Sequence, residues 1–445
     1  MNQVMYTNKQ LKDMIVPLIA EQFLVMLVGL ADTFVVSYAG EAAVSGVSLV
    51  NSFNTIFLFL FTALASGGAV VVSQYIGRKN TDKASEAVSQ LLMVSVLFSA
   101  AVSVLILIFN QGIIRAIFGQ VEPEVEEACV TYLRISAYSY PALAVYNAGA
   151  ALYRSVGKTS TTMKISIIAN VINVAGNLIG VFALHAGVAG VAYPSLISRV
   201  FSAVVITLLC FRDQEGVRYR WRQILAWKSE LLKTIMGIAV PNGLESGIFQ
   251  LVKVGLSSIV ALFGTSQIAA NGIAQSIWSV VSLVSVAMDA VFITVIGQCM
   301  GAGDTLQAEA YFKKLMKLTV GISLAWNGLI ALFTPWIAGT YAVSEETRQY
   351  VLYLVLIHNL GNSILFPFAD PLGKGLRAAG DVKYTVVVSL FTTIGVRLLL
   401  SLLFGIVLQM GVIGIALAMC MDWLVRAVLF WIRFKKGRWK TFQVV

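Results

Sequence analysis

The chain has 445 residues, of which 58% are hydrophobic and only 12% charged, and its mean hydropathy is +0.82. These values exclude an ordinary soluble domain and predict an integral membrane protein. The sequence has no Walker loop, no zinc-ligand spacing and no catalytic nucleophile pattern, so neither ATP-driven transport on this chain nor enzyme activity is expected.

Apolar stretches of membrane-spanning length recur along the whole chain. About 20 apolar residues are enough for a helix to cross a bilayer. The first six predicted spans are 14–38, 47–75, 88–109, 130–153, 161–184 and 188–211. After a polar, basic connection, six more follow at 235–263, 271–299, 315–337, 350–373, 383–408 and 411–432. The sequence therefore predicts an all-α integral membrane protein with twelve transmembrane helices.

The second half of the chain repeats the first. At an offset of 224 residues, Glu21 falls on Glu245. Arg154-xx-Gly157 meets Arg377-xx-Gly380 at an offset of 223, so one residue has been gained or lost in between. The predicted domains are an N-terminal six-helix lobe at 1–211, a cytoplasmic linker at 212–234 and a C-terminal six-helix lobe at 235–445.

An even number of helices in each lobe has a geometric consequence. Both lobes must run in the same sense through the membrane, so the axis of their pseudo-twofold symmetry lies along the membrane normal. We expect two bundles that face each other across a central cleft and rock between inward-open and outward-open states.

Lysine and arginine indicate the orientation in the membrane. The loop after the second predicted span carries Arg78, Lys79 and Lys83, and the linker and the C-terminal end are also basic. The loops on the opposite side carry little positive charge, so the positive-inside rule places both termini in the cytoplasm, and a plasma-membrane location is expected. This asymmetry, together with anionic membrane lipid, accounts for the formal net charge of +10 without a nucleic-acid partner.

Polar side chains inside the predicted spans are candidates for function. A charged side chain at mid-span costs roughly 2.5–3.5 kcal/mol on insertion scales, so it needs a partner or a purpose. Asp32 lies late in the first span, and the fifth span carries Asn170, Asn173 and Asn177 on one helical face. Interhelical hydrogen bonding is a sufficient explanation for Asn170. Asn173 and Asn177, taken with Asp32, instead favour a functional site.

Several motifs, taken together, resemble one transporter family. They are Pro17…Glu21-Gln22…Ala31-Asp32-Thr33, the repeated Gln74-Tyr-Ile-Gly77 and Gln298-Cys-Met-Gly301, Leu376-Arg377-Ala-Ala-Gly380-Asp381, and Gly187-xx-Gly190-Val-Ala192. With the duplication, the chain resembles the prokaryotic branch of the multidrug and toxic compound extrusion (MATE) family over essentially its full length. The resemblance implies secondary antiport. The sequence does not give the oligomeric state, but a duplicated monomer already has the two halves that alternating access needs, and no cofactor is expected. A sodium ion or proton would move in while a small organic substrate, often cationic, moves out.

The resemblance also implies a cation site in the N-terminal lobe. In the branch that this chain most resembles, the site uses an Asp of span 1, an Asn and an Asp four residues apart on span 5, and a hydroxyl residue on span 6. Asp32, Asn173 and Ser195 match these positions, but Asn177 stands where the family often has Asp. The resulting cage can still offer hard oxygen ligands to Na⁺. A proton mechanism would depend on Asp32 alone.

The repeat supplies an internal comparison for this site. The second lobe has lost the acid and gained a guanidinium, which would repel a cation. We therefore expect a single coupling-ion site, in the N-terminal half. The C-terminal counterparts of Asp32, Asn173, Asn177 and Ser195 are Leu256, Arg397, Ser401 and Met419.

A multidrug cleft would be lined by adaptable apolar and aromatic side chains. The intramembrane carboxylates Glu21, Glu245 and Asp289 are candidates for the cleft. Glu245, Lys253 and Asp289 would alternatively form a structural ion pair that joins spans 7 and 8, and the sequence leaves both readings open. Spans 2 and 8 supply the remaining candidates, which are Asn51, Phe53, Asn54, Gln275, Trp278 and Met288.

A flippase or exporter of a lipid-linked or polysaccharide precursor is the alternative function. Proteins of that kind belong to the wider superfamily with related helical bundles. They commonly have more than twelve spans or an arginine-rich groove, and neither is evident here. The sequence does not name the substrate and does not choose between Na⁺ and H⁺.

Overall fold

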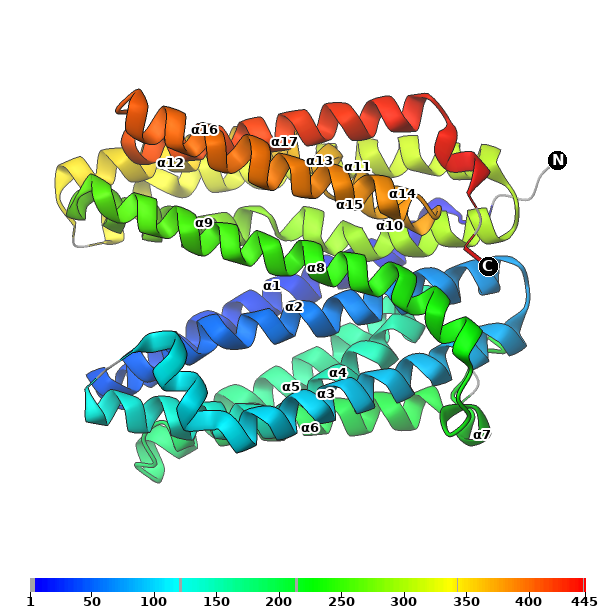
Figure 1. Cartoon of the computed structure of the whole chain (residues 1–445), viewed down its shortest axis with the longest axis horizontal. Helices are drawn as coiled ribbons and strands as arrows, with labels where there is room; N and C mark the ends of the chain where they lie inside the picture. The colour runs from blue at the N-terminus through cyan, green and yellow to red at the C-terminus, as the bar shows by residue number, and fades with distance from the viewer. Residues whose placement is uncertain (1–4, 120–121, 213–214, 342, 443) are drawn as a thin grey trace. The chain divides into compact units, whose positions relative to one another are not determined.

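The computed structural model of the chain describes residues 5–119, 122–212, 215–341, 343–442 and 444–445. Every regular element within these ranges is a helix (Figure 1). The helices form an N-terminal unit, Asn8–Gly243, and a C-terminal unit made of residues 5–7 and Leu244–Val445.

The boundary between the units falls inside one long helix, α8 (Ser229–Val260), rather than in the predicted linker at 212–234. The first part of α8 belongs to the N-terminal unit, where it approaches α2 (Glu41–Gly77) at one point. A Cβ added to Gly67 of α2 would lie 2.8 Å from the backbone nitrogen of Ala239. The small residue therefore allows the two helix backbones to touch.

The N-terminal unit is arranged around α4 (Pro123–Ser155), which contacts α2, α3 and α6. Helix α1 packs against α5, and α5 packs against α6. The other elements of this unit are α1 (Asn8–Ser37), α3 (Thr81–Phe118), α5 (Thr159–Leu178), the π turn η1 (Ile179–Ala183), α6 (Ala189–Cys210) and the short α7 (Trp221–Ile224).

In the C-terminal unit, α12 (Glu345–Ile364) lies beside α9, α11 and α17 (Figure 1). Helix α10 contacts α11 and α14. The remaining elements are η2 (Ala261–Phe263), α9 (Thr265–Val281), α10 (Leu283–Gly301), α11 (Thr305–Thr340), α13 (Phe366–Ala369), α14 (Pro371–Ala378), α15 (Val382–Leu390), η3 (Phe391–Leu398), α16 (Leu399–Leu402), η4 (Leu403–Val407), α17 (Gly411–Lys435) and η5 (Arg438–Thr441).

The described residues contain ten helices that are long and apolar enough to cross a membrane. An eleventh span is formed if Glu345–Ile364 and Phe366–Ala378, which meet at a bend of 56°, are counted together. Helix α4 covers the predicted span 130–153 but is not among them, because tyrosines, serines and Arg134 lower its hydropathy. The sequence expectation of twelve spans therefore depends on α4.

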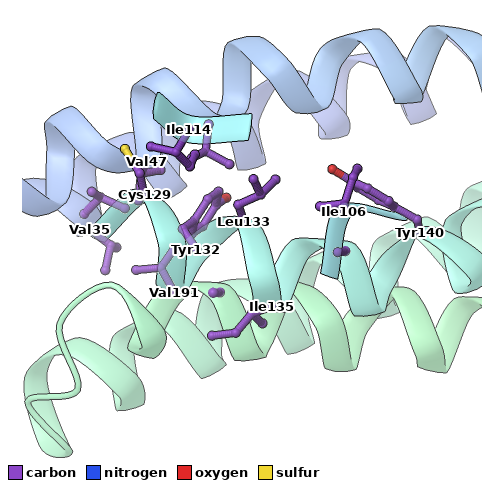
Figure 2. Packing of buried hydrophobic residues seen from close by; sticks show 14 of the residues in the cluster. Val35, Val47, Ile106, Ile114, Cys129, Tyr132, Leu133, Ile135, Tyr140 and Val191 are labelled. Carbon is purple, nitrogen blue, oxygen red and sulfur yellow. The ribbon is translucent and has the colours of Figure 1, made fainter. Parts of the chain in front are cut away.

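The low hydropathy of α4 fits its place in the unit. Cys129, Leu133 and Tyr140 of α4 are almost completely buried, and Figure 2 shows them packed among apolar side chains of neighbouring helices such as Val47. On its buried face α4 can carry polar side chains such as Tyr132 and Tyr140, because their hydroxyl groups find hydrogen-bond partners instead of lipid.

The duplication extends to the backbone conformation. Gly40 and Gly264 both have positive φ angles, of 105° and 91°. His185 and Gln409, which are unusual because they have side chains in this region, have φ angles of 49° and 53°. The π turns η1 and η4 also lie 224 residues apart. Each unit therefore repeats the same turns at the same places, although few side chains are shared.

Candidate functional site

The four side chains predicted to bind a coupling ion lie in one chain of hydrogen bonds. Asn177 Nδ2 donates to Asp32 Oδ1 at 2.6 Å and to Asn173 Oδ1 at 3.1 Å. Asn173 Nδ2 in turn donates to Ser195 Oγ at 2.9 Å, and Ser195 donates to the carbonyl oxygen of Val191 at 3.1 Å. Residues from α1, α5 and α6 therefore meet at one place inside the N-terminal unit.

Local sequence explains how two of these helices, α5 and α6, come together. Gly176 lies next to Asn177 on α5, and a Cβ at Gly176 would lie 2.6 Å from the ring of Pro194 on α6. The missing side chain allows α6 to approach, so that Ser195 reaches α5. The π turn η1 starts two residues after Asn177, and π turns often mark functional sites because they shift the side chains around them.

The cluster is rich in oxygen atoms, and its two asparagines are sheltered from solvent. Asn173 and Asn177 are 6% and 1% exposed. Asn177 Oδ1 is buried and accepts no hydrogen bond within the part of the chain that the structure describes. Leaving a buried polar atom unpaired costs about 1–3 kcal/mol, so a proton donor or a cation beside this oxygen would stabilise the site. Asp32 supplies one negative charge to balance such a cation.

Arg199 is a further charged residue of this site, and the sequence reading missed it. It lies one helical turn after Ser195 on α6, and its guanidinium donates to Ser139 Oγ at 2.7 Å. Its charge acts on Asp32. An arginine in the middle of an apolar stretch is itself a signal of function, and the same test that selected Asp32 would have found it.

Glu21 and Glu245 occupy equivalent places in the two units, and each forms an ion pair with an arginine. Arg154 Nη2 lies 2.9 Å from Glu21 Oε1, and Arg377 Nη2 lies 2.6 Å from Glu245 Oε2. Glu21, which is 3% exposed, also accepts a hydrogen bond from Thr162 Oγ1 at 2.9 Å. Both carboxylates therefore join helices of their own unit.

Glu245, Lys253 and Asp289 do not form the ion pair that was the alternative prediction. Glu245 pairs with Arg377 instead, because Arg377 projects from the neighbouring α14. Asp289 lies 3.9 Å from Lys374. Lys253, eight residues after Glu245 on α8, lies about 12 Å further along the helix axis and lines a separate cavity.

Two of the cleft candidates of span 2, Asn51 and Asn54, contact α4 within the N-terminal unit. Asn51 Oδ1 accepts a hydrogen bond from Tyr132 at 3.2 Å, and Asn54 Oδ1 accepts one from Tyr140 at 2.5 Å. Phe53 stacks edge-to-face on Phe57 with ring centroids 5.1 Å apart. Asn51 is exposed and Asn54 is buried, so only the first presents its side chain at a surface of the unit.

The cleft candidates of span 8 divide in a similar way. Gln275 and Trp278 line a cavity in the C-terminal unit. Met288 is completely buried among the apolar side chains of α10, so its side chain packs in the core and does not reach a cleft. The predicted span covers both environments because 271–299 comprises α9 and α10, which meet at Ser282.

Comparison with known proteins gives one consistent result. The family model described as MatE matches residues 17–179 and 241–403, two segments separated by the repeat offset of 224. An uncharacterized transporter of Bacillus subtilis, YisQ, is 25% identical over 433 residues, covering 95% of this chain and 93% of the relative. A probable multidrug resistance protein of Thermotoga maritima, NorM, is 22% identical over 450 residues, covering 98% and 94%.

Solved structures show the same fold. A multidrug resistance MATE family transporter of the MOP superfamily, in an outward-facing conformation, superposes with a TM-score of 0.90 at 20% identity. The match covers 98% of this chain and 97% of that chain. At this level of identity the similarity concerns the fold rather than the ligands.

Proposed function

Since the chain belongs to the MatE family of multidrug transporters, we propose that it is a secondary active antiporter that exports small organic compounds in exchange for Na⁺ or H⁺. The exported compounds would often be cationic. The protein would work as a monomer of twelve transmembrane helices in the plasma membrane, with both termini in the cytoplasm. Alternating access would come from rocking of its two halves around a central cleft.

The observation that carries the coupling part of the proposal is the hydrogen-bonded chain from Asp32 to Ser195. It brings one carboxylate, two amides and a hydroxyl together inside a membrane unit. Intramembrane ionisable groups are costly and are retained for ion pathways and proton relays. The buried, unpaired Asn177 Oδ1 offers an additional oxygen to a cation.

Each group has a distinct part in the proposed cycle. Asp32 holds the coupling ion by its charge, and the oxygens of Asn173, Asn177 and Ser195 replace part of the hydration shell of Na⁺. When the ion leaves, Asn177 Nδ2 and the charge of Arg199 remain to stabilise the free carboxylate. If a proton is the coupling ion, Asp32 carries it, because it is the carboxylate of this cluster.

Purified protein in liposomes tests the proposal. A sodium gradient and a pH gradient are imposed separately, and the movement of a fluorescent organic cation such as rhodamine 6G is followed. We expect one gradient to drive transport in the wild type and Asp32→Asn to abolish it. Asp13→Asn, an exposed acid on the same helix, is the matched control.

The outcomes separate the possible failures. Ion-coupled transport that survives in Asp32→Asn would show that the coupling site lies elsewhere. Transport that neither gradient drives would contradict the antiport proposal itself. Driving by sodium alone would identify the cluster as a sodium site, whereas driving by pH alone would identify Asp32 as the proton carrier.

A further inference from the structure

The C-terminal unit contains a cavity of about 70 Å³ that the coupling proposal does not use. Side chains from α8, α9, α12, η3 and α17 surround it. Its charged lining residues are Lys253 and Arg397, and no aspartate or glutamate belongs to the described residues that line it. The cavity is therefore a cationic site within the membrane region.

Both cations lie deep in their spans. Lys253 precedes the end of η2 by ten residues, and Arg397 precedes the end of η4 by ten residues. At 1.5 Å per residue each lies about 15 Å from the end of its span. A charge at such a depth is costly unless it is paired or contacts water or a ligand.

The protein itself compensates these charges only in part. Asp422 accepts hydrogen bonds from Arg426 Nη2 with both oxygens, at 2.9 and 3.3 Å, and its Oδ2 lies 3.9 Å from Arg397 Nε. Lys253 has no ion pair among the described residues, and its charge is repelled by that of Arg397. Two arginines thus share one carboxylate, and Lys253 adds a positive charge beside them, which leaves an excess of positive charge.

Unpaired hydrogen-bond donors add to this excess. Arg397 Nε and Trp278 Nε1 are buried and donate no hydrogen bond within the described ranges, and neither atom can act as an acceptor. Both residues line the cavity. Donors and positive charges without acceptors favour a ligand that brings acceptor oxygens and negative charge.

The repeat shows that this cavity is the counterpart of the coupling-ion cluster. The positions of Asp32, Asn173 and Ser195 are taken by Leu256, Arg397 and Met419, and all three of these residues line the cavity. Each unit thus has a polar site at the same place in the same fold. The N-terminal site carries a carboxylate and the C-terminal site carries a guanidinium, so their polarities are opposite.

We propose that the cavity is an anion site that binds the carboxylate of an amphipathic organic acid. The guanidinium of Arg397 presents planar donors that match the two oxygens of a carboxylate, and Lys253 adds a second positive charge. Phe249, Ile415 and Met419 form apolar walls for a hydrophobic body, which chloride or inorganic phosphate lacks. This proposal adds a ligand class to the proposed function. Binding at the cavity can be tested by itself, whereas transport of the ligand rests on the proposed function.

Binding is tested on the purified full chain in detergent by isothermal titration calorimetry. The probes are benzoate, its neutral isostere benzamide, the cation benzylamine, chloride and phosphate. We expect benzoate to bind more tightly than the other four. Lys253→Gln and Arg397→Gln should each weaken benzoate binding roughly tenfold or more. Lys233→Gln removes the same charge from an exposed place on the same helix and should have no effect.

The results distinguish this site from a general effect of charge. Equal binding of benzoate and benzamide, or unchanged benzoate binding in Lys253→Gln, would overturn the proposal. Equal binding of chloride or phosphate would overturn the assignment to organic acids. Because Arg397→Gln removes a partner of Asp422, thermal unfolding of each variant is measured first, and Lys253→Gln, without such a partner, carries the decision if Arg397→Gln does not fold.

A transport experiment separates this inference from the proposed function. Benzoate movement is followed in liposomes under the gradient that drives the organic cation. If benzoate binds but no gradient moves any compound, the site stands and the antiport proposal fails. If the cation is transported but benzoate does not bind, the antiport proposal stands and the anion site fails.

Discussion

Arg154 lies 2.9 Å from Glu21, and the same ion pair recurs between Arg377 and Glu245 in the second half of the chain. The two pairs lie at equivalent positions of the repeat, although the hydrogen-bonded cluster around Asp32 has no chemical equivalent in the C-terminal unit. The pair therefore belongs to the framework that both units share, rather than to the polar sites, whose chemistry differs between the units.

Glu21→Gln and Glu245→Gln are expected to destabilise the protein by about 3 kcal/mol or more, because each removes the carboxylate with which a charged arginine pairs. Glu245→Gln should have the larger effect, since the side chain of Arg377 is 6% exposed and that of Arg154 is 27% exposed. Thermal unfolding in detergent measures both. Glu230→Gln, whose side chain is 90% exposed, is the control. An unchanged unfolding temperature in both variants would contradict a structural role.

Asn177→Asp would place a second carboxylate beside Asp32. The amide nitrogen of Asn177 now lies 2.6 Å from Asp32 Oδ1. Two carboxylates at one site attract a cation more strongly than one, so the half-saturating Na⁺ concentration should fall roughly tenfold in a sodium-driven transport assay. Asn170→Asp makes the same change two helical turns away on α5 and should have a smaller effect. Equal effects of the two variants would argue against direct contact between residue 177 and the ion.

Arg199→Gln is expected to increase the apparent affinity for Na⁺, on the order of several-fold. The charge of Arg199 acts on Asp32 and repels a cation that binds there. The variant also loses the hydrogen bond to Ser139, so its thermal stability is measured in parallel. Arg134→Gln, an exposed arginine on α4, controls for general loss of charge. Weaker sodium binding in Arg199→Gln would mean that this residue supports the site by packing.

Gly190→Val should destabilise the N-terminal unit by about 1–3 kcal/mol and weaken ion coupling as well. A Cβ at this position would lie 2.7 Å from the backbone of Gly180, so α6 would have to move away from η1 and would carry Ser195 with it. Thermal unfolding and sodium-driven transport report the two effects. Gly112→Ala, where nothing lies within 4 Å of the added Cβ, should change neither.

The sequence predicted the local and periodic features of this protein well. Long apolar runs indicated helices because a bilayer requires each backbone to satisfy its own hydrogen bonds. The offset of 224 residues predicted a duplication, and the backbone repeats it at Gly40 and Gly264. Asp32, Asn173, Asn177 and Ser195 were selected from the sequence by a family resemblance, and the structure brings them into one hydrogen-bonded chain. Their role as a coupling site stays a prediction.

Only the tertiary structure determines which charged side chains form ion pairs with each other. The sequence suggested Lys253 and Asp289 as partners of Glu245, but helical rise separates Lys253 from it, and the packing of α14 brings Arg377 to 2.6 Å. Met288 was predicted to line the cleft, but its side chain is completely buried and lies in the core. Periodicity tells which residues share a helix face, whereas the neighbour that covers this face depends on how distant segments pack, and that is a property of the folded chain as a whole.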